Sequence, residues 1–213
     1  MFFDVNSWKK DISDIVNQPF DASEAHFEMA PYREINREIY INPIHSSVGI
    51  HFYFADEPVI ILIERPITMR KHAGQIAFPG GKQDIGDHNL IKTALRESNE
   101  EIGISITDLT SCGSLTKVYI PVTNYLIHSF IFLHDQRPKM VHNPEEVKEI
   151  FEVKLSEILL PETKTIIDVK QTGGITLKNV PCFLIQNKII WGATSLLLNE
   201  LKYRISRFHR PVV

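Results

Sequence analysis

The chain has 213 residues, of which 43% are hydrophobic and 23% charged, close to the average for soluble globular proteins. This length suits one domain with extensions, and the composition argues against a disordered or fibrous chain. The formal net charge of −3 lacks the basic excess of proteins that grip nucleic-acid backbone, so we expect no nucleic-acid partner.

Membrane insertion and secretion are also disfavoured by the sequence. The longest purely apolar run, Val59–Ile63, is far too short for a membrane-spanning helix. The first residues include an acid, Asp4, and lack the apolar stretch of a signal peptide. Two cysteines, Cys112 and Cys182, cannot build a disulfide framework. We therefore expect a cytoplasmic protein with no membrane partner, and the sequence leaves open whether it forms a homodimer.

The first part of the chain is predicted to be an extension. Residues Val5–Val16 carry apolar side chains at helical spacing, which predicts a short amphipathic helix. A polar segment interrupted by prolines follows as far as Pro43. We expect residues 1–45 to pack as an extension on a domain formed by residues 46–213.

Strand-like and helical segments alternate along the rest of the chain. Residues 47–54 and 58–66 predict strands, and residues 70–81 predict a loop. A helix is expected from the N-cap Asp87 to Gly103, and a last helix from residue 193 to 207. Further strands are expected at 114–120, 125–133, 147–153, 165–169 and 180–185. This order favours an α/β domain around a mixed β-sheet.

The expected helix that starts at Asp87 concentrates negative charge on one side. Its packed face would hold Ile91, Ala94, Leu95, Ser98 and Ile102. Glu97, Glu100 and Glu101 share an exposed arc of about 100° on another side. Arg96 precedes Glu100 by four residues, the spacing of a helical ion pair.

Crowded glutamates near a helix C-terminus repel one another and meet the unfavourable end of the helix dipole. A divalent cation relieves both effects, and carboxylate and carbonyl oxygens are the ligands that Mg²⁺ or Mn²⁺ prefers. Pro79 and the glycines Gly80 and Gly81 before the helix allow a sharp turn that exposes backbone carbonyls. On spacing alone, a solvated helix face without a ligand is an equal alternative.

Taken together, these residues resemble the Nudix box. The matching residues are Gly81, the acid Asp87 and the run Arg96-Glu97-x-x-Glu100-Glu101-x-Gly103. Asp87 stands where the family usually has glutamate and is one residue further from Arg96, and Ser98 replaces the usual aliphatic residue. The resemblance implies a Nudix-type α/β/α sandwich around a mixed sheet and a pyrophosphohydrolase that uses Mg²⁺ or Mn²⁺.

A second signature is similar to that of the coenzyme A diphosphatase branch of the Nudix family. It consists of Arg70, Gly74 and the run Phe78-Pro79-Gly80-Gly81, with softer matches at Asn143–Val147 and Ile190–Thr194. The segment before it keeps Arg65 but lacks the branch's threonine and small residue. The resemblance implies cleavage of coenzyme A to 3′,5′-ADP and 4′-phosphopantetheine.

Site roles follow from this reading. The metal ligands would be Glu97, Glu100, Glu101 and the Gly80 carbonyl. The same three glutamates would carry catalysis, with Arg96 orienting Glu100 and the identity of the base left open. The substrate-binding residues would be Arg70 as a phosphate clamp, Gly80, Gly81 and Phe78, whose packing is expected to position the glycine turn.

Other charged residues have weaker support. Glu146 and Glu149 flank an expected strand start, but each alone is better explained as a solvated acid. The segment Pro161–Val213 holds an excess of basic residues, which predicts either a solvated surface or a positive rim for a polyanionic ligand.

Two alternatives to a coenzyme A diphosphatase stay open. The same chemistry could act on ADP-ribose, a dinucleotide or a damaged nucleoside triphosphate. The fold could also serve as a binding module without catalysis, although the intact set of glutamates argues against this.

Overall fold

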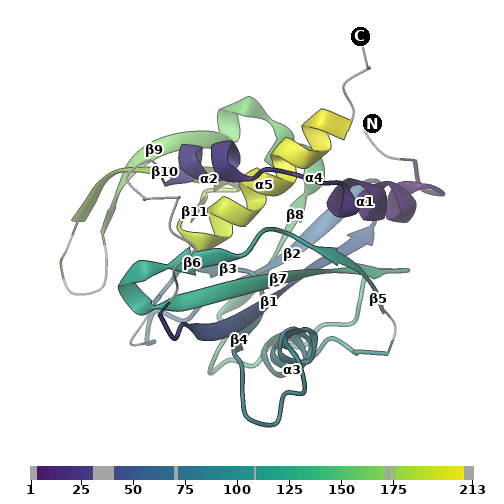
Figure 1. The fold of residues 1–213 in the computed structure, drawn as a ribbon, viewed down its shortest axis with the longest axis horizontal. Coiled ribbons are helices and arrows are strands. Elements are labelled where there is room, and N and C mark those ends of the chain that lie inside the picture. Colours follow the sequence, from purple (N-terminus) through teal and green to yellow (C-terminus); the bar gives the residue numbers. More distant parts are fainter. Residues whose placement is uncertain are drawn as a thin grey trace.

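An eight-stranded mixed β-sheet forms the centre of the computed structural model in Figure 1, which describes residues 4–30, 41–69, 72–107, 109–170, 174 and 176–208. Its strands are β1 (Ile44–Phe54), β2 (Pro58–Glu64), β3 (Ile76–Ala77), β4 (Gly80–Lys82), β5 (Leu109–Ser114), β6 (Val118–Ile120), β7 (Tyr125–His134) and β8 (Glu149–Lys154). The order β3-β2-β1-β7-β5 runs through the sheet, with β4 beside β1, β6 beside β7 and β8 beside β2.

The central pairing makes the sheet mixed. β1 runs parallel to β7, from Ile44 opposite Tyr125 to Phe52 opposite Leu133, and antiparallel to β2. β2 is buried along its whole length, as expected for a strand covered on both faces. A separate antiparallel sheet contains β9 (Lys164–Lys170), β10 (Thr176–Ile185) and β11 (Lys188–Ile190).

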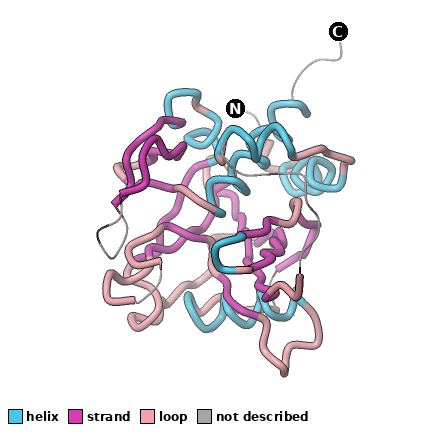
Figure 2. The backbone as a smooth tube through the Cα atoms, turned by 60° about the vertical axis from the view of Figure 1, so that its left-hand side comes forward, coloured by secondary structure: helices cyan, strands magenta, loops and turns pink. Residues whose placement is uncertain are grey.

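Helices cover both faces of the large sheet. One face carries α3 (Leu90–Ile102), and the other carries α1 (Trp8–Asn17), α2 (Ser23–Met29), α4 (Leu155–Leu159) and α5 (Ala193–Phe208). Two 3₁₀ turns, Pro121–Thr123 and Pro161–Thr163, complete the described elements. In the turned view of Figure 2, strands again lie between helices above and below them. This layering confirms the expected α/β/α sandwich.

The two layers have separate apolar cores. Ile60 and Leu62 of β2 belong to the larger core, which also contains residues of α1 and α5. Ile61 and Ile63 point to the other face and pack with Ile102 at the end of α3. The alternation of one strand therefore ties both helical layers to the sheet.

Most expected elements form, and the exceptions are short. α1, β1, β2 and α5 lie where the sequence places them, and α5 buries the expected Leu197, Leu198, Leu201 and Ile205. The sequence predicts neither the helices α2 and α4 nor the short strands β3, β4 and β11, and the strand expected at 114–120 is divided between β5 and β6. None of the described helices is long and apolar enough to cross a membrane.

The N-terminal segment is built into the core. Trp8, Ile12 and Ile15 of α1 are at most 4% exposed and belong to the larger core. β1 begins at Ile44, so we keep the boundary near residue 45 as a proposal. Because α1 and α2 both pack against α5, the extension and the domain share one apolar core.

A buried polar cluster strengthens this contact. The Glu200 carboxylate is fully buried and accepts hydrogen bonds from the backbone and hydroxyl of Thr116 and from Arg204 Nε at 2.9 Å. His26 of α2 lies 3.1 Å from the same carboxylate. Arg204 also donates to the carbonyls of Val16 and Gln18 at the C-terminal end of α1. Every charge in this cluster has a partner.

Candidate metal centre

A tight turn between β3 and β4 forms one wall of the site. Gly80 has φ +156°, and a Cβ there would overlap the backbone of Ser47 and Val48 on β1, so only glycine fits. Gly49 donates its N–H to the Pro79 carbonyl at 2.8 Å, which fixes the turn to the sheet. The turn was expected as a loop and instead adds β4 to β1.

Phe78 holds this turn from the inside. Its side chain is 2% exposed and belongs to the larger core. The expectation that its packing positions the glycine turn agrees with this placement, whereas its assignment as a substrate contact does not.

Helix α3 forms the opposite wall. Its N-cap is Asn89, whose side chain accepts from Lys92 N at 2.9 Å, and it ends at Gly103 with φ +66°. The N-cap expected at Asp87 is therefore wrong. Asp87 instead accepts two hydrogen bonds from Arg96, at 3.0 and 2.9 Å. This bidentate ion pair holds the loop before α3 against the middle of the helix.

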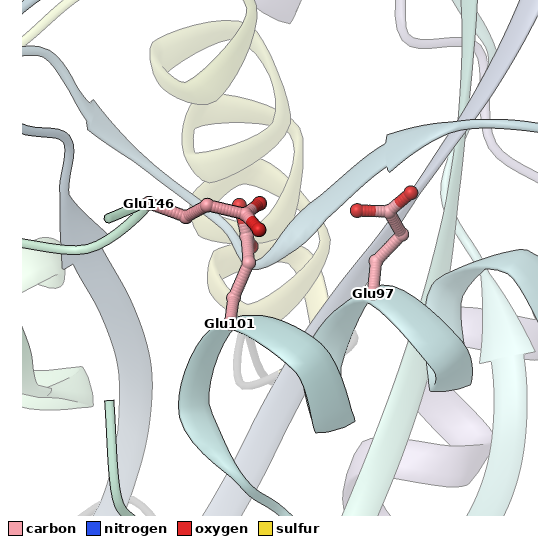
Figure 3. Close-up of side chains that lie close together, drawn as sticks. All are labelled: Glu97, Glu101 and Glu146. Carbon is pink, nitrogen blue, oxygen red and sulfur yellow. The ribbon is translucent and has the colours of Figure 1, made fainter. Parts of the chain in front are cut away.

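Three carboxylates meet between these walls. Oxygens of Glu97, Glu101 and Glu146, hereafter the carboxylate cluster, all lie within 4.8 Å of one another. Figure 3 shows the first two side chains rising from neighbouring turns of α3, with Glu146 reaching toward them from the segment before β8.

The expected exposed strip of glutamates is only partly correct. Glu101 is 1% exposed, and the Glu97 side chain is 13% exposed. Glu101 lies on the helix beside the buried Ile102 and is covered by the β3–β4 turn and by the segment that carries Glu146. A helical wheel cannot reveal this burial, because the covering residues belong to other elements.

Asn143 positions Glu146. The Asn143 N–H donates to the Glu101 carbonyl at 2.9 Å, and its side-chain amide donates to Glu146 Oε1 at 3.3 Å. Its side-chain oxygen accepts from Glu145 N at 3.1 Å. One asparagine therefore docks the Glu146 segment onto the end of α3. Glu149 takes no part and pairs with Lys188.

The charge on Glu101 is poorly compensated. One oxygen accepts the Gly80 N–H at 2.8 Å, and the other lies 3.4 Å from Arg65 Nη1. The pKa of Glu101 is raised to about 8, chiefly by burial and also by the negative charges of Glu97 and Glu146, which together outweigh these two donors. Burial also raises the pKa of Glu97. A cation placed among the three oxygens would remove this cost.

Arg96 and Glu100 lie at the edge of the carboxylate cluster. Arg96 Nη1 is 2.9 Å from both Glu97 Oε1 and Glu100 Oε2, which agrees with the expected pairing. The Glu100 side chain is 49% exposed and stands outside the cluster, where Glu146 takes the third place. Coordination by Glu100 stays a proposal.

The other residues expected at the site are two glycines and Arg70. A Cβ at Gly81 would overlap the Glu97 carboxylate, so this glycine leaves room for a cluster member. The Gly80 N–H serves Glu101, and coordination by the Gly80 carbonyl stays a prediction. Arg70 lies outside the described residues.

The carboxylate cluster fits a hard divalent cation. It offers only oxygen donors, which suit Mg²⁺ or Mn²⁺, and zinc would favour nitrogen or sulfur. The cationic partner of its most buried member, Glu101, is Arg65 at 3.4 Å, which leaves the charge poorly compensated. The sequence alone favours a solvated acid at Glu146, although the similarity at Asn143–Val147 marks the segment that carries it.

An open cleft of about 610 Å³ lies beside the end of β2, and the three glutamates of the carboxylate cluster are not among the residues that line it. Its lining includes Glu64, His72, Lys170, Lys188 and Trp191. The cleft wall at residues 72–76 is hydrogen-bonded to the backbone of Arg65, which contacts Glu101. Arg65 therefore contacts the cleft wall through its backbone and the carboxylate cluster through its side chain.

Comparison with known proteins agrees with this arrangement. Residues 43–171 match the family model described as the NUDIX domain. The protein named "Uncharacterized Nudix hydrolase NudL" of Photorhabdus laumondii is 34% identical over 164 residues, covering 77% of this chain and 86% of that protein. Its namesake from Yersinia pestis is 34% identical over 161 residues, covering 76% of this chain and 79% of that protein.

A solved structure shares the fold. The MutT/nudix family protein from Enterococcus faecalis has a TM-score of 0.51 at 13% identity, covering 90% of this chain and 76% of that chain. Together with the sequence matches and the site geometry, this shows that the chain belongs to the Nudix hydrolase family, whose enzymes use divalent metal ions.

Proposed function

We propose that this Nudix hydrolase cleaves the diphosphate of coenzyme A or its thioesters, releasing 3′,5′-ADP and the 4′-phosphopantetheine part. The observation that carries the hydrolytic part is the carboxylate cluster, in which oxygens of Glu97, Glu101 and Glu146 converge and the charge of the buried Glu101 is poorly compensated. Nucleoside diphosphate derivatives are the substrate class that such a centre suits. The cytoplasmic location expected from the sequence belongs to the same proposal.

Glu97, Glu101 and Glu146 would hold Mg²⁺ or Mn²⁺, which when bound screens phosphate charge and lowers the pKa of water. A carboxylate near the reacting phosphorus accepts a proton from the attacking water. The oxygen of that water bonds to phosphorus, and the bond from this phosphorus to the bridging oxygen breaks. The second phosphate leaves with the bridging oxygen.

Arg65 is suited to hold a phosphate during this reaction. Its Nε is buried with no hydrogen-bond partner among the described residues, and its contact with Glu101 is long, at 3.4 Å. A guanidinium with unused donors binds phosphate oxygens in a fixed orientation. We keep Arg70 as a second phosphate clamp on the strength of the sequence signature alone.

The coenzyme A assignment rests on the sequence signature and on the cleft. Part of the basic excess of Pro161–Val213 is used in other ion pairs, because Lys164 pairs with Glu28 and Arg204 with Glu200. Lys170 and Lys188 remain on the cleft wall, although Lys188 also binds Glu64 and Glu149. These two lysines are the candidates for the 3′-phosphate of coenzyme A.

Product identification by mass spectrometry tests the proposal. Coenzyme A, 3′-dephospho-coenzyme A and ADP-ribose are compared at one Mn²⁺ concentration. We expect kcat/KM for coenzyme A to exceed that for the dephosphorylated form by about tenfold, since a charge-assisted hydrogen bond contributes roughly 1.5–3 kcal/mol. Equal rates on these two compounds would reject the role of the lysines. A preference for ADP-ribose would reject coenzyme A and keep the hydrolytic assignment.

A further inference from the structure

A buried chain of hydrogen bonds links the central sheet to α3. His51 of β1 is fully buried, and its Nε2 lies 2.8 Å from Ser98 Oγ on α3. Its Nδ1 lies 2.9 Å from Nε2 of His134, at the end of β7. Ser98 Oγ lies 2.7 Å from the Ala94 carbonyl.

The chemistry of these groups fixes the direction of the chain. A carbonyl only accepts, so the single hydroxyl proton of Ser98 goes to Ala94. Ser98 Oγ must then accept from His51, which places the proton of a neutral imidazole on Nε2. His51 Nδ1 is left as an acceptor, and His134 Nε2 donates to it. Burial lowers the pKa of His51 to about 3, which keeps the ring neutral.

Gly49 leaves the space that this chain needs. A Cβ at Gly49 would lie 2.6 Å from His51 Nε2 and 2.8 Å from Ser98 Oγ. Any side chain there would therefore displace the histidine–serine hydrogen bond. Ser98 itself stands where the Nudix box usually has an aliphatic residue. Gly49, His51 and Ser98 thus form one matched set.

The anchored residue lies between two members of the carboxylate cluster. Ser98 follows Glu97 by one residue and precedes Glu101 by three, so it lies between them along the helix axis. Both glutamate side chains leave the helix on the same side of Ser98, about 60–100° around the axis from it. An apolar contact at this position would hold α3 at the same depth without fixing its rotation. A short hydrogen bond is directional and resists rotation and sliding.

We propose that His51 and Ser98 are positioning residues, which hold Glu97 and Glu101 at the angle that a divalent cation requires. This inference rests on the proposed metal centre. It predicts that removing the hydrogen bond weakens metal binding more than a comparable loss of a buried serine elsewhere. Mutation of a residue that orients a metal ligand typically weakens metal affinity by about 10–100-fold.

Calorimetric titration with Mn²⁺ tests the inference on the full chain. The variants are Ser98→Ala and the matched control Ser195→Ala, which removes an equally buried helical serine bonded to the Gly192 carbonyl. We expect Ser98→Ala to raise the Kd for Mn²⁺ about tenfold and to lower kcat, with KM changed less than twofold. Ser195→Ala should keep the wild-type Kd.

The results separate this inference from the proposed function. Wild-type protein that binds no Mn²⁺ would reject the metal centre and the inference with it. Wild-type binding that Ser98→Ala leaves unchanged would overturn the positioning role alone. If Ser98→Ala does not fold, Ser98→Cys keeps the size with a weak acceptor, and an unchanged Kd in that variant would overturn the role equally.

Discussion

Two buried glutamates in this protein have opposite surroundings. Glu200 is fully buried, and Arg204, His26 and Thr116 all face its carboxylate. Glu101 is 1% exposed, yet it has one backbone donor, a long contact with Arg65 and two further carboxylates as neighbours. The pKa of Glu200 is lowered by its donors in spite of burial, whereas that of Glu101 is raised to about 8.

The difference distinguishes a structural carboxylate from a functional one. A buried charge that has all its partners stabilises the fold that supplies them. A buried charge without them destabilises the fold unless a ligand from outside completes the set. Glu200 belongs to the first kind and Glu101 to the second, so mutation should affect stability at one and catalysis at the other.

The largest expected effect is on stability at Glu200. Glu200→Gln leaves the buried Arg204 guanidinium without its counter-charge, which should lower the free energy of unfolding by about 3–5 kcal/mol. Urea denaturation measures this loss. The control Glu24→Gln removes an exposed partner of Arg207 and should change stability by less than about 1 kcal/mol. An equal effect of both variants would contradict the structural role of Glu200.

Glu101→Gln should have its main effect on turnover. We expect kcat to fall at least about a hundredfold, because a charged ligand and its electrostatic contribution are lost. Steady-state kinetics at saturating substrate and Mn²⁺ measure this. The control Glu145→Gln removes an exposed charge two residues after Asn143 and should keep wild-type kcat. Wild-type kcat in Glu101→Gln would contradict the catalytic role of Glu101.

Metal should stabilise the wild type by a smaller amount. At ten times its Kd, a cation that binds only the folded chain adds about 1.4 kcal/mol to the free energy of unfolding. Thermal melts with increasing MnCl₂ show this as a rising Tm. Glu200→Gln should keep the shift and Glu101→Gln should lose most of it. If millimolar metal leaves the Tm of the wild type unchanged, the carboxylate cluster is not the site where the cation binds.

A further prediction concerns how stability depends on pH without metal. The pKa of Glu101 is about 8 in the folded chain and near the ordinary value of 4.5 in the unfolded chain. The free energy of unfolding should therefore fall as pH rises from 4.5 to 8. The slope stays below the roughly 1.4 kcal/mol per pH unit of one fully linked proton. Denaturation in EDTA at pH 5, 6, 7 and 8 measures it. An identical slope in Glu101→Gln would show that another group is responsible.

The contribution of Glu200 to stability should depend on pH in the opposite direction. Its pKa is lowered in the folded chain, so its contribution is present above the ordinary value of 4.5 and is lost as pH falls below it. The acid limb of the stability curve should therefore flatten in Glu200→Gln. An unaltered acid limb would mean that its partners do not hold the charge as the structure indicates.

Local signals made part of this structure predictable. The end of α3 at Gly103 follows from the need for a left-handed residue, and the buried positions of α5 follow from helical spacing. The pair Glu97 and Glu101 also follows, since four residues return the helix to nearly the same direction.

The remaining features depend on contacts between distant segments. Glu146 joins the carboxylate cluster only because Asn143 binds the end of α3. The hydrogen bond from His51 to Ser98 requires β1 to lie under the helix, and the one sign of it in the sequence was a serine on an apolar face. The short helix α2 sits in a polar segment and is held by packing on α5. Single-segment patterns carry no information on such neighbours.

The parallel pairing of β1 with β7 has a consequence for how the chain acquires its site. These strands are distant in sequence, and α3 and the β3–β4 turn lie between them along the chain. Pairing of this kind closes a large loop before its contacts can compensate the lost entropy, which slows folding. During synthesis, β1 must wait for β7 to emerge, and Glu146 emerges later still. The metal centre should therefore be among the last parts of the molecule to form, and metal added during refolding should act after the sheet has assembled.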